Sequence, residues 1–438
     1  MCRSQLKIFK SSVCLGLLLC NFKLLALEFE PGIGVGLEYT DNAKLSADNQ
    51  LDDLIAVGYI GAMLREDDGP LQADITASLN HHRYTKDTYK DLRYFSLAAK
   101  AGWEMIKNRF DWILRNFYHQ RPINSSDPNT PDNIQDSNAF TFGANIVYPI
   151  SARQVFTLFP EYGNFYYEIQ DTDNQQFSLD ASWNYEISDV TNAGWSASVR
   201  TVVYDEPVIN DVNFGNISFI FSNIRARSNI STRLGSTYVE RENGQSTVEL
   251  AGNLNWLVDL TGRSRIRTFI ATNLTDSSNG VLTATVDPEV GDPSDIQITT
   301  DVVRVQVISL GYLRQDGTLN SSLTGQLRNL NYSESPNDRR IWSVNAVFGY
   351  PITALLSSGF YGRYNYIDYL DTGRLDNNFT IGGGIRYQLS RKLSSRFDIK
   401  YRNRDSTSDS ASFEEWSVFA SLTYGFGEPM RPSRSGGF

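Results

Sequence analysis

The stretch Glu415–Phe426, EWSVFASLTYGF, decides the fold of this chain. Successive side chains of a β-strand point to opposite faces, so every second residue would share one face. One face would carry Trp416, Val418, Ala420, Leu422, Tyr424 and Phe426, and the other Ser417, Phe419, Ser421, Thr423 and Gly425. An apolar face with aromatic rings near both ends is typical of a strand that crosses a bilayer. A strand of a water-soluble sandwich can alternate in the same way, so the rest of the chain must decide.

The same alternation recurs along the chain in about twenty segments of roughly ten to fifteen residues. Regular examples are Leu71–Tyr84, Phe177–Ile187 and Leu393–Arg404. Their polar faces carry charges at mid-strand, which suits a wet lumen better than the packed interior of a sandwich. Some segments, such as Phe214–Phe221, are less regular, so about eighteen strands is the alternative count. The pattern predicts an all-β fold, a transmembrane antiparallel outer-membrane β-barrel of about twenty strands.

The connections between these segments alternate between short and long. Short links include EDDG, PISA and LTG, whereas long links include TDNAKLSADNQLDD and DSTSDSASFEE. A barrel with an even number of strands and both termini in the periplasm has short periplasmic turns and long extracellular loops. The composition does not shift along the chain, so we expect one barrel over residues 27–426, followed by a C-terminal tail over residues 427–438.

The composition also excludes some classes of protein. The 438-residue chain has a formal net charge of −10, and an acidic balance argues against nucleic acid as a partner. After the N-terminal region, no run approaches the ~18 continuous apolar residues of a transmembrane helix.

Residues 1–26 have the features of a secretory signal peptide. Arg3, Lys7 and Lys10 precede the short apolar run SSVCLGLLLC, and cleavage is expected near Ala26. The alternatives are a membrane anchor, for which the apolar run is too short, and a lipoprotein signal, which would need a small residue before Cys20. All three cysteines lie in this segment, so the mature chain would have no disulfide and no cysteine-based metal site.

The polar faces of the segments supply the candidate site residues. Seven charged residues are expected to face the lumen: Arg386, Arg396, Asp398, Lys400, Arg402, Asp180 and Glu186. Rings of charge can orient a polar or anionic solute and set the selectivity of a channel. The same charges can also pair across the lumen and neutralise one another, and the sequence leaves both interpretations open.

The segment Thr275–Asp301 is the longest predicted loop and is acidic. It contains Asp276, Asp287, Glu289, Asp292, Asp295 and Asp301, and no lysine or arginine. We interpret it as a solvated surface loop. The alternative is a functional loop that bridges divalent cations to lipopolysaccharide or screens charge at a channel mouth. Its DPEVGDPSD run lacks the spacing of an EF-hand loop, so we predict no metal site.

No segment has the pattern of an enzyme active site. GxSxG, HExxH and paired-carboxylate motifs are absent, and the histidines are only His81, His82 and His119. We interpret these histidines as interfacial or rim residues, and we expect neither catalytic residues nor a cofactor. The glycine runs GIGVG (residues 32–36) and IGGGI (residues 381–385) match no phosphate loop. Within strands such glycines allow bending or the close approach of another segment.

Two hairpins carry a resemblance to a known family. They are NLNWLVDLTGRSRIRTFIATNLTDSS, residues 253–278, and DIKYRNRDSTSDSASFEEWSVFASLTYGF, residues 398–426. They resemble a strand–turn–strand hairpin and the closing hairpin of the β-barrel porins of exopolysaccharide and exosortase-associated gene clusters. The resemblance implies an outer-membrane barrel that serves as a conduit for secreted polysaccharide, without catalytic residues. Such barrels usually stop at the aromatic residue of the last strand, whereas GEPMRPSRSGGF follows Phe426 here.

We therefore expect a non-enzymatic channel in the outer membrane of a Gram-negative bacterium, assisting exopolysaccharide export. The alternatives are a general diffusion porin for small solutes and a barrel that acts as a surface scaffold without conducting. The expected partners are outer-membrane lipid and lipopolysaccharide, the barrel-assembly machinery, and the exopolysaccharide with its export proteins.

Overall fold

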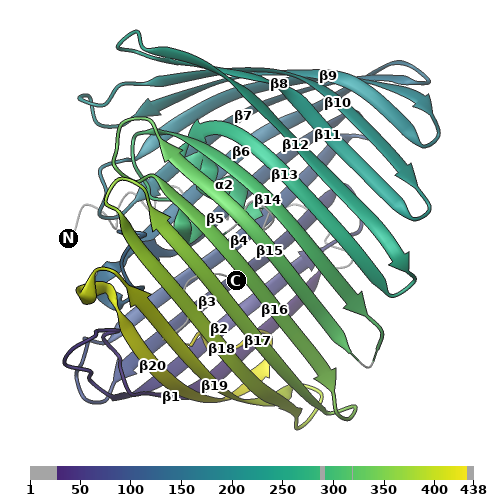
Figure 1. Cartoon of the computed structure of the whole chain (residues 1–438). Coiled ribbons are helices and arrows are strands. Elements are labelled where there is room, and N and C mark those ends of the chain that lie inside the picture. The colour runs from purple at the N-terminus through teal and green to yellow at the C-terminus, as the bar shows by residue number, and fades with distance from the viewer. Residues whose placement is uncertain (1–26, 287–291, 318, 432–438) are drawn as a thin grey trace.

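A single closed β-sheet makes up almost the whole structure, a computed structural model that describes residues 27–286, 292–317 and 319–431. Twenty antiparallel strands form this sheet, and each pairs with its neighbours in the sequence (Figure 1). The expected signal peptide, residues 1–26, lies outside the described residues. The predicted all-β outer-membrane-type barrel of about twenty strands is confirmed.

The strands are long and of similar length. Their bounds are β1 Glu28–Thr40, β2 Asp53–Glu66, β3 Leu71–Tyr84, β4 Leu92–Ile106, β5 Phe110–Pro122, β6 Ile134–Ser151, β7 Gln154–Tyr167, β8 Asn174–Ser188, β9 Thr191–Tyr204, β10 Val212–Arg225, β11 Ser228–Arg241, β12 Ser246–Thr261, β13 Ser264–Asp276, β14 Val302–Gln315, β15 Asn320–Tyr332, β16 Arg339–Pro351, β17 Leu356–Tyr369, β18 Arg374–Gln388, β19 Leu393–Ser406 and β20 Phe413–Gly425.

Short helices occur only in connections within the described residues. They are the 3-10 helices η2 Pro131–Asn133, η4 Pro293–Asp295 and η5 Asp409–Ala411, and the α-helix α2 Ser277–Val286. Among the described helices, none has the length and apolar character needed to span a membrane.

The first and last strands close the barrel. Pairing between β1 and β20 runs from Gly32 opposite Gly425 to Thr40 opposite Ser417. No water is available at mid-bilayer to bind an unpaired strand edge, so closure is what lets this sheet cross a membrane. The first and last strands of the chain are therefore neighbours in the closed sheet.

The two ends of the barrel differ in their connections. At one end, the short-turn end, links such as residues 152–153 and 262–263 contain only a few residues. At the other, the long-loop end, they include residues 41–52, 123–133 and 277–301. The alternation of short and long connections is less strict than the sequence predicts, because strand pairing continues into some of the segments expected to be loops. Between β17 and β18, for example, only residues 370–373 are outside the strands.

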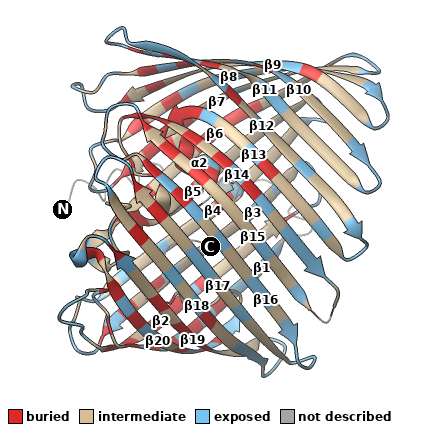
Figure 2. Ribbon diagram, in the orientation of Figure 1, coloured by how far each residue is buried: buried red, intermediate tan, exposed pale blue. Residues whose placement is uncertain are grey.

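The alternation of side chains separates an outer apolar face from an inner polar face. On β20, Leu422 is 42% exposed on the outside, whereas the neighbouring Ser421 is 9% exposed on the inside. Figure 2 shows that buried residues gather in the half of the barrel nearer the long-loop end, around α2. The lumen is therefore filled unevenly along its axis.

Ile217→Arg tests which face meets lipid. Ile217 lies near the middle of β10 and is 58% exposed on the outer face, so Arg should lower the free energy of unfolding in lipid vesicles by about 2–4 kcal/mol. The matched control is Asn216→Arg, one residue earlier on the inner face, where water can hydrate the new charge. Urea titrations of both variants provide the measurement, and equal losses would contradict the assignment of faces.

Candidate functional site

The described residues of the β13–β14 connection, 277–286 and 292–301, fold into the lumen and define the candidate site. The side chain of Asp276 accepts a hydrogen bond from the Asn279 N–H at 2.9 Å, which satisfies a free amide in the first turn of α2. Ser277 Oγ donates to the Thr299 carbonyl at 2.6 Å and so ties the start of this segment to its return. We call residues 277–301 the lumen loop.

Apolar contacts hold the lumen loop against the inner wall. Val281, Ala284, Ile296 and Ile298 are buried. They pack against one cluster of inward-facing residues contributed by β7 and by β13 to β17, namely Phe165, Tyr167, Phe269, Val303, Val305, Val307, Leu330, Tyr332, Ile341, Ile367 and Tyr369. Burial of each larger aliphatic side chain contributes roughly 1.5–3 kcal/mol, enough to offset the ordering of its own residue.

Three acidic residues of the lumen loop, and Asp276 at the end of β13 just before it, are matched by arginines of the wall. These ion pairs are Asp276 with Arg200 at 3.0 Å, Asp292 with Arg363 at 3.3 Å, Asp295 with Arg328, and Asp301 with Arg241 at 2.8 Å. Arg328 is 1% exposed, so this guanidinium needs its carboxylate partner. The negative charge of the loop therefore complements a positive inner wall.

The interpretation of Thr275–Asp301 as a solvated surface loop was wrong. Its acidic residues suggested exposure to solvent, but Val281, Ala284, Ile296 and Ile298 decide its position by packing inside the barrel. The expected positions Asp287 and Glu289 lie outside the described residues.

Asp301 anchors the C-terminal end of the lumen loop. Burial by itself would raise the pKa of Asp301, but hydrogen bonds from Ser333, Ser335 and Glu334 outweigh burial and lower this pKa. The backbone N–H groups of Glu334 and Ser335 donate at 2.9 and 2.6 Å, and Ser333 Oγ donates at 2.7 Å. A carboxylate with so many donors is stabilised in its ionised form.

The Asp301 anchor should fail in acid. Because the pKa is lower in the folded state, its stabilisation is fully present above the unfolded pKa of about 3.9 and is lost as the pH falls through the folded pKa. A nitroxide label at Thr300 should therefore become mobile below about pH 4. Asp301→Asn should make the label mobile already at neutral pH. The control Asp52→Asn removes an exposed pair with Lys86 elsewhere and should change nothing. An immobile label in Asp301→Asn would contradict the anchor.

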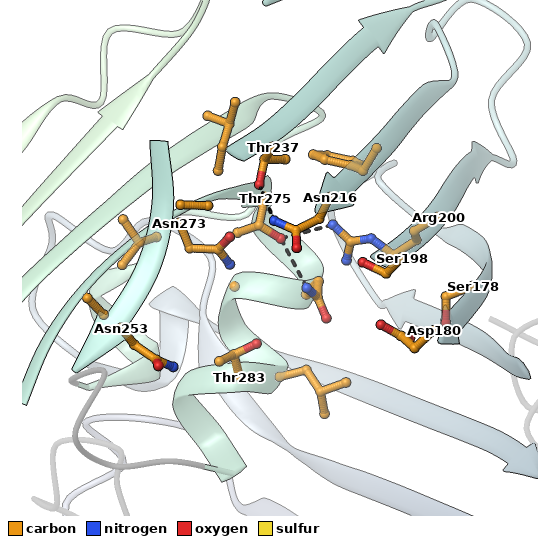
Figure 3. Close-up of a pocket in the computed structure, with 18 of the residues that line it drawn as sticks. Ser178, Asp180, Ser198, Arg200, Asn216, Thr237, Asn253, Asn273, Thr275 and Thr283 are labelled. Carbon is orange, nitrogen blue, oxygen red and sulfur yellow. Dashed lines mark hydrogen bonds between the residues drawn. The ribbon is translucent and has the colours of Figure 1, made fainter. Parts of the chain in front are cut away.

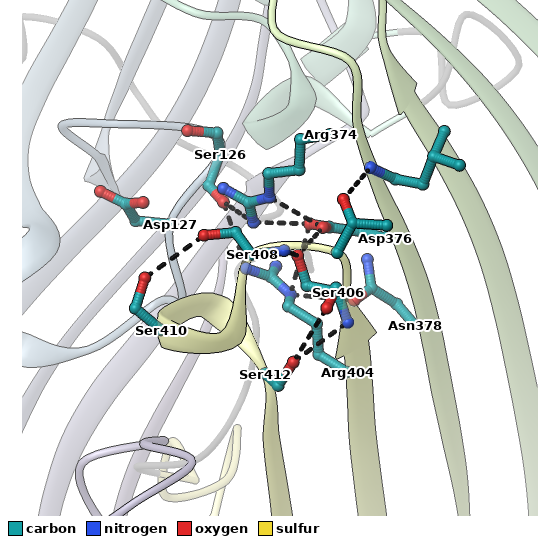
Figure 4. Close-up of polar contacts among 12 residues, drawn as sticks. Ser126, Asp127, Arg374, Asp376, Asn378, Arg404, Ser406, Ser408, Ser410 and Ser412 are labelled. Carbon is teal, nitrogen blue, oxygen red and sulfur yellow. Dashed lines mark hydrogen bonds and ion pairs between the residues drawn. The ribbon is translucent and has the colours of Figure 1, made fainter.

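A second loop reaches across the long-loop end of the barrel. The carbonyl of Ser126, in the β5–β6 connection, accepts hydrogen bonds from Arg374 at 3.0 Å and Arg404 at 3.2 Å, on β18 and β19 (Figure 4). Both arginines face the fully buried Asp376, which also accepts from Ser406 Oγ at 2.6 Å. On its other side, the loop binds the lumen loop through Ser125 and Gln297 at 2.8 Å. The two loops thus form one hydrogen-bonded layer near the mouth.

A polar cavity of about 410 Å³ remains between α2 and the inner wall. Figure 3 shows amide and hydroxyl groups of several strands pointing into this space beside the helix. The polar lining residues include Gln176, Ser178, Ser198, Asn216, Thr237, Asn253, Asn273, Thr275, Asn279 and Thr283. Buried Phe165, Phe214 and Phe269 complete the lining. We call this space the lumen cavity.

The charges around the lumen cavity are largely matched. Arg200 pairs with Asp276, donates to Thr275 at 3.1 Å and lies over the Phe214 ring at 4.4 Å. Glu161 pairs with Arg115 at 3.3 Å. Asp180 and Arg233, of opposite sign, line the same space. The cavity therefore presents mainly neutral hydrogen-bonding groups to a solute.

The structure places the seven charged residues predicted to face the lumen in two regions. Around β18–β20, Arg402 pairs with Glu415 at 2.6 Å, Arg396 pairs with Asp398, and Arg386 and Arg396 both pair with Glu428 of the tail. Lys400 is buried on the same strand as Arg396. On β8, Asp180 lines the lumen cavity, whereas Glu186 does not. The pairs on β18–β20 lie on a different part of the wall from the cavity.

Several functional residues were missed from the sequence. Arg241 and Arg328 hold the lumen loop, and Arg121 donates to the Ile296 carbonyl at 2.9 Å. Each lies near the long-loop end of its strand. In the sequence, each of these residues is an arginine on the polar face of a strand, near the long-loop end. The sequence does not show its partner, which lies far away along the chain.

The three histidines, expected to be interfacial or rim residues, lie within three residues of the long-loop end of β3 or β5 and differ in burial. His82 is 1% exposed, points inward and contacts the Tyr94 ring edge-on at 4.9 Å. His119 lines a small space against α2, together with Val281 and Leu282. His81 is partly exposed, 3.9 Å from Asp91. The three histidines therefore do not share one site.

Comparison with known proteins finds one family that matches the closing part of the chain. Residues 350–426, from the end of β16 to the end of β20, match the family described as "Putative beta-barrel porin 2". The predicted resemblance to β-barrel porins is confirmed over this closing part of the chain. No curated protein is similar to the chain in sequence.

The solved structure of a siderophore receptor has a similar fold. The siderophore receptor PirA from Pseudomonas aeruginosa is 11% identical, with a TM-score of 0.50 over 91% of this chain and 80% of that chain. The FrpB iron transporter from Neisseria meningitidis is 8% identical, with a TM-score of 0.47 over 91% and 81% of the two chains. At such identities the likeness concerns the fold alone.

Proposed function

We propose that the protein is a non-enzymatic channel in the outer membrane of a Gram-negative bacterium and that it assists exopolysaccharide export. The lumen cavity carries this proposal, because it places many amide and hydroxyl groups inside a closed barrel. The match of residues 350–426 to a porin family supports a channel. The two loops at the long-loop end would then face the outside, and the short turns would face the periplasm.

The chemistry of the lumen cavity favours a polyhydroxylated solute over an ion. Arg200 and Glu161 are already in ion pairs, and the remaining charges of the lining, Asp180 and Arg233, are of opposite sign, so an anion would find little net positive charge. Asn and Gln amides can donate to and accept from sugar hydroxyls. Contacts of this kind are individually weak, and conduction requires that a solute can also leave. Lipid, lipopolysaccharide, the barrel-assembly machinery and export proteins are the partners that such a channel would need.

Planar-bilayer recordings test the channel. Purified, folded protein should conduct, and replacement of residues 278–299 by a short Gly/Ser linker should raise the single-channel conductance, because the lumen loop occupies part of the cross-section. Absence of conductance in both proteins would contradict a channel.

Sugar recognition is tested by adding soluble oligosaccharides to the same recordings. Asn253→Leu and Asn273→Leu remove hydrogen-bonding groups from the lumen cavity, so they should shorten the transient blocks of current. Asn345→Leu is the matched control, since Asn345 is bonded to Arg363 at 2.7 Å and does not line the cavity. Blocks of equal length in all three variants would contradict a sugar site in the cavity.

Export itself is tested in a deletion strain. Loss of secreted polysaccharide, restored by the wild-type gene, is the expected result. Normal secretion combined with reduced uptake of small solutes would instead indicate the general diffusion porin.

A further inference from the structure

The chain does not end with the last strand but turns back into the barrel. Gly425 and Gly427 have φ of +85° and +80°, a backbone conformation that glycine adopts most readily. Between them, the Phe426 N–H donates to the Pro31 carbonyl at 3.1 Å, and Tyr59 Oη donates to the Phe426 carbonyl at 3.2 Å. These contacts direct the following residues along the inside of β1. We call residues 426–431 the strap.

The glycines of GIGVG in β1 make room for the strap. Gly32, Gly34 and Gly36 point inward, while Ile33 and Val35 between them are more than half exposed on the outer face. A Cβ on Gly32 would come within 1.8 Å of the Phe426 carbonyl oxygen, and one on Gly34 within 2.9 Å of Pro429 Cγ. A side chain at either position would therefore collide with the strap. The glycine run forms a groove that fits this segment of the same chain.

Polar contacts anchor the strap along its length. Glu428 pairs with Arg386 and, at 2.5 Å, with Arg396. The Met430 N–H donates to Asn80 Oδ1 at 2.8 Å. Arg431 pairs with Glu38 at 3.5 Å and lies over the Phe419 ring at 5.4 Å, and both Arg431 and Glu38 are buried. These partners lie on β1, β3, β18, β19 and β20, so the strap crosses the inner side of the barrel seam.

We infer that the strap is a built-in obstruction of the lumen that must be displaced for full conduction. It lies along the seam side of the barrel, while the lumen loop packs on inward residues of β7 and of β13 to β17. The two internal segments thus narrow the lumen from different sides. The strap is held by ion pairs and a glycine groove, contacts that can break without disrupting the strands. This inference rests on the proposed channel function.

The test compares full-length protein with three variants in planar bilayers. A chain that ends at Phe426 lacks the strap, and Gly34→Val keeps the strap but blocks its groove, so both should show higher single-channel conductance. Gly58→Val on β2 is the control, because a Cβ there meets nothing within 4 Å, and it should conduct like the wild type.

A disulfide tests displacement directly. Gly34→Cys with Pro429→Cys, in a chain whose three native cysteines are serine, should form a bond because these positions nearly touch. The oxidised protein should conduct no more than the wild type, and reduction should raise its conductance.

The outcomes separate the strap from the channel. Each variant is first checked for folding by the heat-dependent shift of its band on a gel. Equal, measurable conductance in the wild type, Gly34→Val and any folded truncated chain would contradict the proposal that the strap obstructs the lumen. The proposal that the protein is a channel would still stand. If the truncated chain does not fold, the conductances of Gly34→Val and of the disulfide variant test whether the strap obstructs the lumen. If the wild type and every folded variant are silent, both proposals are overturned.

Discussion

The pairing of β1 with β20 is the constraint on which the rest of the structure depends. In a bilayer, an unpaired strand edge would leave its N–H and C=O groups without a partner, so the sheet must close on itself. Closure also fixes the side of every residue, because neighbouring strands are in register and side chains alternate. The apolar outer face and the polar inner face follow from this closure.

A closed barrel of twenty strands is too wide for wall side chains alone to fill it. Here the chain supplies the filling from its own connections, the lumen loop and the β5–β6 loop near the mouth and the strap along the seam. Each is held by arginines or glycines that a strand presents on its inner face. What remains between the lumen loop and the wall is a neutral, hydrogen-bonding cavity.

The barrel could be predicted from the sequence because its signal is local. The alternation of apolar and polar residues, as in Glu415–Phe426, predicts the two faces of a strand, and short links such as LTG predict the turns. The position of the lumen loop could not be predicted in the same way. The number of its charged residues and its length do not show which residues, far away in the sequence, those charges contact. Asp301 pairs with Arg241 and Asp295 with Arg328 only after the sheet has closed. Likewise, the GIGVG run suggested a close approach, but Pro429 as its neighbour became visible only in the structure.

The central claim is that the protein fills its own lumen with the loop between β13 and β14. Hydrogen–deuterium exchange of the protein in lipid vesicles tests it most directly, because buried and bonded amides exchange slowly. We expect the amides of α2 and of Ile296–Ile298 to be protected to a degree close to that of the adjoining strands. Exchange as fast as that of residues 47–50, the exposed part of the β1–β2 connection, would contradict the claim and place the loop in solvent.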